Sequence, residues 1–234
     1  MKKKLVVLTG AGISAESGLK TFRDMGGLWE QYDVMEVASI EGWYRNPQLV
    51  LQFYNDRRKQ LETALPNDGH KGLVDLEKYF DVYIITQNVD NLHEKAGSKN
   101  ILHLHGELTK VRSTKYEDDI QDIGYKELNW GDKCRRGEQL RPHIVWFGEA
   151  VPAIEEAAEI TQTADAFAVV GTSLNVYPAA GLVSYVPRSA PIFLVDPNDV
   201  AISMPGRMEF IKEKAGVGVK LMKEKLLDYF KINP

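Results

Sequence analysis

Lys4-Leu-Val-Val-Leu-Thr-Gly-Ala-Gly-Ile-Ser-Ala15 is the stretch of sequence that best indicates the fold. It opens with a short apolar run, Leu5–Leu8, which is typical of a strand buried on both faces of a sheet. The segment Gly10–Ala15 then fits the pattern G-x-G-x-x-G/A, in which glycines let the backbone approach a phosphate. This combination predicts the first unit of a nucleotide-binding fold. Alone it is weak, because a tight strand-to-helix turn without a ligand has the same form.

Further apolar runs of similar length recur along the chain. They lie at Val82–Ile85, Ile101–Leu104, Ile144–Phe147, Phe167–Val170 and Ile192–Val195. Segments with helical spacing of apolar residues separate several of these runs. They are His70–Tyr79, Ile154–Thr163 and Val219–Phe230. Strands that alternate with helices indicate βαβ units, so we expect an α/β fold with a Rossmann-like parallel sheet flanked by helices.

Two regions break this alternation and predict a smaller second domain. Residues 31–68 have the pattern of helices with polar faces, and residues 111–139 are strongly charged without a persistent period. We therefore assign residues 1–30, 69–110 and 140–234 to a large Rossmann-like domain that binds a nucleotide. The two insertions would form a small helical or irregular domain.

The composition is that of an ordinary globular protein, with 234 residues, 44% hydrophobic and 26% charged. A formal net charge of -4 gives no general attraction to nucleic acid or to an anionic membrane, so we expect neither as a partner. No apolar run has the length of a transmembrane helix. The single cysteine, Cys134, excludes an intrachain disulfide. These features predict a cytoplasmic protein and leave its oligomeric state open.

Polar and glycine motifs directly follow five of the strand-like runs. In chain order they are Thr9–Gly12, Thr86–Asp90, His105–Glu107, Gly148–Glu149 and Gly171–Ser173. In open parallel sheets, ligands bind in the crevice beyond the carboxyl ends of the strands. We therefore expect the five motifs to form one composite site.

The residues after the glycine loop do not fit an ordinary dehydrogenase. Such an enzyme carries an acidic residue at the end of its second strand, about 20 residues after the glycines. Here the segment Phe22–Trp29 contains two adjacent glycines and is typical of a loop. An oxidoreductase with a Rossmann fold is therefore disfavoured. Arg23 is a candidate partner for a phosphate, with an ordinary surface arginine as the alternative.

Taken together, these motifs resemble the sirtuin family of NAD-dependent protein deacylases. The resemblance covers nearly the whole chain in the family's order. It rests on Gly10–Gly18, Thr21–Arg23, Thr86–His93, His105–Glu107, Leu140–Glu149 and Gly171–Ala180. It implies an enzyme that removes acyl groups from lysine side chains of proteins or peptides. NAD would be consumed, and nicotinamide and O-acyl-ADP-ribose would be released.

The resemblance also implies roles for individual residues. Those expected to bind NAD are Gly10, Ala11, Gly12, Glu16, Thr21, Phe22, Arg23, Trp29, Gln87, Asn88, Asp90, Gly171, Thr172, Ser173 and Ala215. Those expected to pair with an extended substrate peptide, adding it as a strand, are Val145, Trp146, Phe147 and Gly148.

His105 is the candidate catalytic residue. Once nicotinamide has left, a ribose hydroxyl needs a base whose pKa is near neutrality, and histidine suits that task. His103 and His105 are two residues apart, so in a strand they share a face. A metal pair and a purely structural role are the alternatives, but two histidines without a third ligand do not by themselves indicate a metal. We interpret His103 as a strand residue and His93 as helix packing.

Tyr54 and Arg57 suggest which acyl group is removed. They are three residues apart in a segment of helical character, Pro47–Leu61, so they would share one face. A Tyr–Arg pair can hold a carboxylate by a hydrogen bond and a bidentate ion pair. The pair resembles the signature of sirtuins that remove succinyl, malonyl or glutaryl groups. The alternative is a solvated helix face at Arg57–Lys59, and deacetylation is expected in either case.

The sequence departs from the family at three places. Most sirtuins hold a structural zinc with two cysteine pairs, whereas Thr109–Tyr116 contains no cysteine and only Cys134 lies near the second pair. One thiolate cannot build a tetrahedral site, so we predict no zinc and no other metal. Lys20 replaces a proline. Phe193–Asp196 lacks the asparagine expected near the adenosine ribose, which leaves the contacts there open.

Two other functions on the same fold remain as alternatives. An ADP-ribosyltransferase would also cleave the nicotinamide bond, but the peptide-binding segment Trp146–Glu149 disfavours it. A non-catalytic NAD sensor is disfavoured by the intact His105, Asn88 and Asp90.

Overall fold

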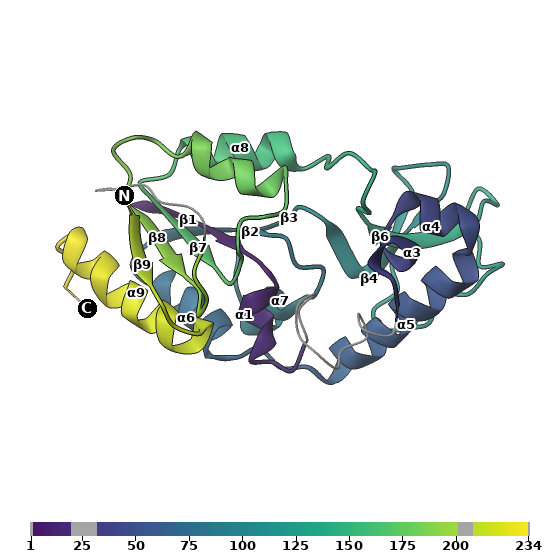
Figure 1. The fold of residues 1–234 in the computed structure, drawn as a ribbon, viewed down its shortest axis with the longest axis horizontal. Coiled ribbons are helices and arrows are strands. Elements are labelled where there is room, and N and C mark those ends of the chain that lie inside the picture. Colours follow the sequence, from purple (N-terminus) through teal and green to yellow (C-terminus); the bar gives the residue numbers. More distant parts are fainter. Residues whose placement is uncertain (1, 20–31, 201–207, 234) are drawn as a thin grey trace.

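A six-stranded parallel sheet forms the centre of the larger of two lobes (Figure 1). The computed structural model describes residues 2–19, 32–200 and 208–233. The strands lie in the order β3-β2-β1-β7-β8-β9, and each neighbouring pair is parallel. Their bounds are β1 Lys4–Thr9, β2 Asp81–Thr86, β3 Ile101–His103, β7 Ala166–Val170, β8 Ile192–Val195 and β9 Met208–Ile211. The predicted α/β class with a Rossmann-like sheet is confirmed.

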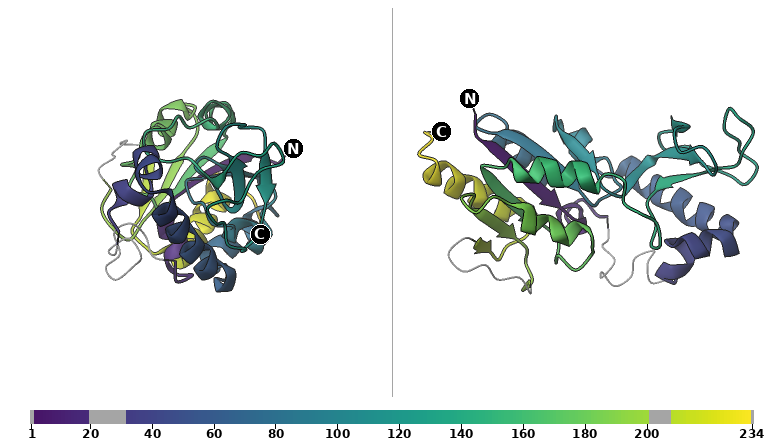
Figure 2. Two further views of the ribbon diagram at one scale, coloured as in Figure 1. Left: turned by 90° about the vertical axis from the view of Figure 1, so that its right-hand side faces the viewer. Right: turned by 90° about the horizontal axis from the view of Figure 1, so that it is seen from above.

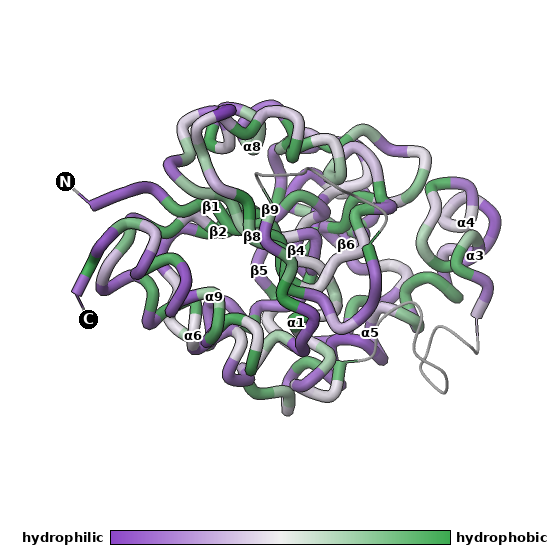
Figure 3. The backbone as a smooth tube through the Cα atoms, turned by 60° about the vertical axis from the view of Figure 1, so that its left-hand side comes forward, coloured by the Kyte–Doolittle hydropathy of each residue, from purple (hydrophilic) through white to green (hydrophobic). Residues whose placement is uncertain are grey.

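Helices cover both faces of this sheet, because alternate residues of each strand point to opposite sides. Leu5 and Val7 of β1 belong to the apolar cluster shared with α6 (Asp68–Leu76) and α9 (Ala215–Tyr229). Val6 and Leu8 belong to the cluster that includes residues of α8 (Ile154–Gln162) and of the 3-10 helix η1 (Ala179–Tyr185). Figure 3 shows the hydrophobic segments running through these strands.

The small lobe is built around an antiparallel sheet of three strands, in the order β5-β4-β6. The strands are β4 Gly106–Ser113, β5 Ile120–Asp122 and β6 Leu140–Ile144. Its helices are α3 Val34–Val37, α4 Ile40–Arg45 and α5 Pro47–Thr63, which lie beside this sheet (Figure 2). Both groups contribute to one apolar cluster. The sheet extends a few residues beyond each end of the predicted insertion 111–139.

The run Ile144–Phe147 does not form a strand of the parallel sheet, so that prediction is wrong. Ile144 ends β6 and pairs with Gly106 in the antiparallel sheet, whereas Phe147 forms only an isolated bridge with Ser39. A short apolar run shows that a segment is buried but does not specify which strand it pairs with. As a consequence, the motif Gly148–Glu149 follows the small sheet and not the large one.

The remaining four motifs do meet at one edge of the large sheet. They follow β1, β2, β3 and β7, whose carboxyl ends lie side by side. The strand order reverses direction at β1, because the chain passes through β2 and β3 on one side before β7 joins the other side. Open α/β sheets bind ligands at such a switch point. Two short helices, α1 (Ala11–Ala15) and α7 (Leu92–Ala96), follow β1 and β2 there.

Among the helices in the described ranges, none combines the length and apolar character needed to cross a membrane.

Candidate active site

The turns after β1 and β7 are packed against each other through glycines. The Gly10 N–H donates to the carbonyl of Val170 at 3.1 Å, and the Gly12 N–H donates to that of Gly171 at 2.8 Å. A Cβ atom on Gly12 would lie 2.7 Å from Gly171 Cα, closer than real Cβ atoms approach. Gly171 itself has φ +66°, a conformation that favours glycine. Two bare backbone turns therefore meet at the switch point.

The loop after β2 closes over these turns. Asn88 donates through Nδ2 to the Gly10 carbonyl at 3.1 Å and to Ser14 Oγ at 3.2 Å. Ser14 in turn donates to Asp90 Oδ2 at 2.9 Å. Burial raises the pKa of Asp90, and its other oxygen accepts from the Leu92 N–H at 3.1 Å. Ser14 is only 1% exposed and was not singled out from the sequence, although it lies inside the glycine motif.

His105 lies just beyond β3, beside the same loop. Its Nδ1 is 3.0 Å from the carbonyl oxygen of Gln87. A carbonyl oxygen only accepts, so Nδ1 carries the hydrogen and Nε2 of the neutral ring keeps its lone pair. Burial lowers the pKa of His105, which favours this neutral form. The Gln87 side chain donates to Thr172 Oγ1 at 3.2 Å, which links the loops after β2 and β7.

Glu16 and Ala215, which are far apart in the sequence, are brought together at the end of α1. The Glu16 carboxylate accepts from the N–H of Gly216 at 2.8 Å, and Ala215 is buried at the start of α9. Ala11 begins α1, and Ser173 is half-buried after β7. The predicted NAD-binding residues Thr21, Phe22, Arg23 and Trp29 lie outside the described residues.

The two other histidines singled out from the sequence have different surroundings. His93 is fully buried in α7, and its Nε2 lies 3.0 Å from Thr9 Oγ1. Burial lowers its pKa well below the ordinary value, which agrees with our interpretation as helix packing. His103 ends β3 and bonds both to the loop after β2 and to Glu94.

Tyr54 and Arg57 lie together on α5 in the small lobe. The guanidinium carbon of Arg57 is 6.0 Å from the centre of the Tyr54 ring. Tyr54 is 1% exposed, and its hydroxyl accepts from Trp146 Nε1 at 2.9 Å. Burial raises the pKa of Tyr54 to about 12 and lowers the pKa of Arg57. The alternative was a solvated helix face at Arg57–Lys59, but Arg58 is fully buried and donates to the Leu108 carbonyl.

The segment expected to pair with a peptide already uses two of its backbone donors. The Val145 N–H donates to the carbonyl of His105 at 3.0 Å, and the Phe147 N–H to that of Ala38 at 2.9 Å. The segment therefore lies directly beside the candidate base. Phe147 is 45% exposed, and Gly148 is exposed with φ +89°. Among the described residues, the Gly148 N–H makes no backbone hydrogen bond.

Arg141 and Glu149 hold the ring and the backbone of Trp146. The Arg141 guanidinium carbon lies 3.6 Å from the ring centre, and the backbone N–H of Trp146 donates to Glu149 Oε2 at 2.9 Å. Glu149 also accepts from both terminal nitrogens of Arg141, at 2.7 and 2.8 Å. Burial opposes its ionisation, but these bonds outweigh it and lower the pKa of Glu149. The position of Tyr54 is thus fixed through Trp146 by an ion pair.

The model of the Sir2 family matches residues 10–178. The chain belongs to the Sir2 family. An NAD-dependent protein deacylase of Bacteroides thetaiotaomicron is 54% identical over 231 residues, which are 96% of this chain and 98% of that protein. An NAD-dependent protein deacylase of Helicobacter pylori strain 26695 is 52% identical over 226 residues, 97% of this chain and 98% of that protein.

Solved structures of the Sir2 family agree in fold. The crystal structure of a Sir2 homologue in complex with NAD shares 36% sequence identity with this chain and has a TM-score of 0.87. The match covers 97% of this chain and 91% of the homologue. The resemblance to sirtuins inferred from the motifs is therefore confirmed. The roles of single residues stay predictions.

Proposed function

We propose that this member of the Sir2 family removes acyl groups from lysine side chains of proteins, with NAD as a consumed co-substrate. Nicotinamide and O-acyl-ADP-ribose would be the other products. Two relatives that share more than half of its residues carry the name NAD-dependent protein deacylase. The observation that carries the proposal for the site is the hydrogen bond from His105 Nδ1 to the Gln87 carbonyl, because it prepares Nε2 as a base.

The residues at the switch point fit the chemistry of NAD. The dinucleotide supplies the nicotinamide leaving group and the ribose that receives the acyl group. The bare turns at Gly10 and Gly171 allow close approach of a pyrophosphate. Asn88, Asp90 and Gln87 offer amide and carboxylate groups that can bond to ribose hydroxyls and to the nicotinamide amide.

His105 is proposed to accept a proton from a ribose hydroxyl. Because its folded-state pKa is lowered, the ring is already neutral at pH 7 and needs no prior deprotonation. Its neighbour in space, Val145, belongs to the segment proposed to bind the peptide. The base and the acyl-lysine would therefore meet at one place, which is what a transfer between two bound substrates requires.

Tyr54 and Arg57 are proposed to hold the carboxylate of succinyl-lysine or malonyl-lysine. The Tyr54 oxygen accepts from Trp146, so its own hydrogen remains to be donated to a ligand. A pKa of about 12 keeps that hydrogen in place at neutral pH. The nearby Arg57 cation supplies the opposite charge. Removal of acidic acyl groups would occur beside deacetylation.

The small lobe is proposed to hold together without zinc. Cys134 is buried in its apolar cluster, and its backbone N–H donates to the Glu138 carbonyl at 2.8 Å. Ordinary packing would then take the place of a metal in this lobe. We expect a chelator to leave its unfolding midpoint unchanged, and a midpoint lowered by EDTA would contradict the proposal.

The test compares acetyl-lysine and succinyl-lysine peptides of one sequence, incubated with NAD and followed by mass spectrometry. We expect NAD-dependent loss of both acyl groups, and no loss with His105→Ala. Arg57→Met should reduce desuccinylation relative to deacetylation, whereas Lys59→Met, an exposed change on the same helix, should not. Loss of acetyl alone would remove the acidic acyl preference. ADP-ribose attached to the peptide, or NAD bound without turnover, would favour a transferase or a sensor instead.

A further inference from the structure

Two histidines at the end of β3 tie down consecutive residues of the loop after β2. His105 Nδ1 lies 3.0 Å from the carbonyl oxygen of Gln87, and His103 Nδ1 lies 3.1 Å from that of Asn88. The two rings therefore hold the backbone of the residues whose side chains are proposed to bind NAD. The proposed catalytic mechanism gives His105 a role but assigns none to His103.

The contacts of His103 assign its protonation state. Nδ1 faces the Asn88 carbonyl, and Nε2 lies 2.7 Å from Oε1 of Glu94. A carbonyl oxygen and a carboxylate oxygen both only accept, so both ring nitrogens must carry hydrogen. His103 is therefore an imidazolium, and its short contact with Glu94 is a charge-assisted hydrogen bond. His105, two residues away, is neutral.

We infer that His103 is a positioning residue. As an imidazolium paired with Glu94, it holds Asn88 in the geometry that binds NAD, and loss of its second proton sets the alkaline limit of activity. The inference rests on the deacylase activity proposed above. It gives neighbouring histidines opposite tasks: His105 acts when neutral, and His103 acts when charged.

The charged groups around His103 favour the cation. Its side chain is 9% exposed and lies between Glu94 of α7 and Glu107 of β4. Lys110 of β4 pairs with Glu107 at 2.6 Å. The charge of His103 acts to lower the pKa of His93, and it opposes the rise that burial causes in the pKa of Asp90. Burial alone lowers the pKa of His103, but the bond to Glu94 and the charges of Glu94 and Glu107 outweigh it, and its pKa is raised.

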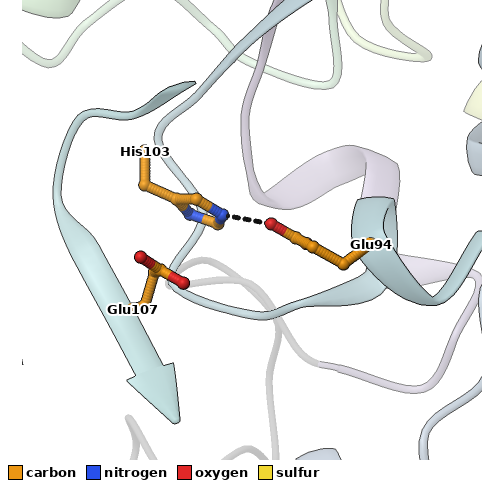
Figure 4. A group of neighbouring side chains, drawn as sticks. All are labelled: Glu94, His103 and Glu107. Carbon is orange, nitrogen blue, oxygen red and sulfur yellow. Dashed lines mark hydrogen bonds and ion pairs between the residues drawn. The ribbon is translucent and has the colours of Figure 1, made fainter. Parts of the chain in front are cut away.

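The same three side chains, Glu94, His103 and Glu107, have the donor set of a divalent cation site (Figure 4). Their ligand atoms lie within 4.8 Å of one another. A cation would need the lone pair of His103 Nε2, which the contact with Glu94 assigns to a proton. It would also have to displace Lys110 from Glu107. The contacts therefore point to a proton at this position, and a metal is an outcome that the test must recognise.

Deprotonation leaves His103 with one hydrogen for two acceptors. If the hydrogen stays on Nδ1, the lone pair of Nε2 opposes the Glu94 carboxylate. If it stays on Nε2, the bond to Asn88 is lost. In both cases the tie on the loop weakens as the pH rises through the pKa of His103. The effect should appear in the KM for NAD more than in kcat, because the loop binds the dinucleotide.

The test measures kcat/KM for NAD against pH in deacetylation. Glu94→Gln removes the charge of the partner, and the glutamine amide can donate to a neutral His103 Nε2, so deprotonation no longer weakens the bond to Asn88 and the alkaline limb should disappear. The acid limb, which belongs to His105, should stay in place. Glu159→Gln, an exposed change of the same kind on α8, is the matched control and should leave both limbs unchanged.

Substitutions of His103 separate its charge from its hydrogen bond. The amide of His103→Asn can still donate to the Asn88 carbonyl but does not titrate, so the alkaline limb should disappear. His103→Leu removes the donor and should raise the KM for NAD about fivefold, the equivalent of one lost hydrogen bond. Thermal unfolding of each variant shows whether the fold is retained.

A measurement without turnover keeps this inference separate from the proposed function. Nitrogen NMR of labelled histidine should show two protonated ring nitrogens for His103 at pH 7 and one for His105. A neutral His103, or a Glu94→Gln alkaline limb that coincides with that of the wild type, would overturn the inference. So would a chelator that reproduces the effect of Glu94→Gln, since it would assign a metal. An inactive wild type would instead refute the proposed function.

Discussion

At the scale of single residues, Gly171 and Gly124 have similar backbone angles in different surroundings. Their φ values are +66° and +58°. A Cβ on Gly171 would lie 2.3 Å from the backbone nitrogen of Ile13, whereas a Cβ on Gly124 would meet nothing within 4 Å. We expect Gly124→Ala to lower the free energy of unfolding by about 1 kcal/mol and Gly171→Ala by about 3 kcal/mol. Urea unfolding measures both. Equal losses for the two variants would show that the turn at Gly171 is not in contact with the turn after β1.

Trp146 offers a second test at this scale, because its Nε1–H is the described partner of the Tyr54 hydroxyl. Trp146→Phe keeps an aromatic ring over Arg141 but removes that donor. We expect kcat/KM to fall about fivefold for a succinyl peptide and less for an acetyl peptide. Trp130→Phe, at a side chain that is 55% exposed, serves as the control. Equal losses for both acyl groups would separate Trp146 from acyl choice.

The sequence alone could place the Tyr54–Arg57 pair on one helix face, because helical spacing fixes neighbours three apart. It could not show that Arg58, the residue after Arg57, is also directed into the protein. Arg58 is fully buried, and its position depends on the Leu108 carbonyl, which reaches it from another element. Likewise the donation from Trp146 to Tyr54 joins residues from α5 and the segment after β6, and no local pattern encodes it.

At the scale of elements, Arg58 joins α5 to β4. Its Nε donates to the Leu108 carbonyl at 2.9 Å, and Asn55 beside it bonds to both backbone groups of Leu128. Arg58→Ala leaves buried acceptors without a donor and opens a cavity, so we expect a loss of about 3 kcal/mol in the free energy of unfolding. Lys59→Ala, its exposed neighbour, should change it little. Chemical denaturation measures the free energy of unfolding of both variants. If Arg58→Ala leaves this free energy unchanged, α5 packs on the small sheet by apolar contacts alone.

The elements could mostly be predicted, since each has a strong local pattern. The helix expected from Ile154 begins there, as α8, and ends one residue earlier than expected. The strands β1, β2, β3, β7 and β8 of the large sheet follow the apolar runs closely, because the central residues of strands buried on both faces are mostly apolar. The edge strand β9, which contains the exposed residues Glu209 and Phe210, was not predicted. The same reasoning could not predict the sheet to which Ile144 belongs, because Ile144 pairs with Gly106, which is distant in the sequence.

At the scale of the whole molecule, two fully buried histidines make stability depend on pH. Burial lowers the pKa of His70 to about 4 and that of His93 well below its ordinary value. The unfolded chain takes up protons below about pH 6.5 while the folded chain does not, so stability falls as the pH falls. Between pH 7 and pH 5, His70 should contribute a loss of about 2 kcal/mol.

His70→Asn provides the comparison, because its side-chain oxygen can still accept from the backbone N–H of Asn67, as Nδ1 of His70 does. Urea unfolding at the two pH values should show a smaller acid loss in the variant by about 2 kcal/mol. An identical slope for both proteins would mean that His70 is not the group that takes up the proton.

The composite site was predictable at this scale for a topological reason. Parallel strands place their carboxyl ends at one edge, so the motifs after β1, β2, β3 and β7 had to meet. The share of the small lobe in the site was not predictable in the same way. Val145 reaches His105 only because β4 and β6 bring the small lobe against the end of β3.

The order of segments along the chain also has a consequence for synthesis on the ribosome. The helices and strands of the small lobe are complete by Ile144, whereas β7, β8 and β9 begin only at Ala166. The small lobe can therefore close its core while β1 still lacks its partner β7 and exposes the edge from Leu5 to Thr9. An unpaired apolar edge of this kind attracts other chains. A nascent chain of which the residues up to about Ile144 have left the ribosome is thus the species most exposed to aggregation, through the open edge of β1.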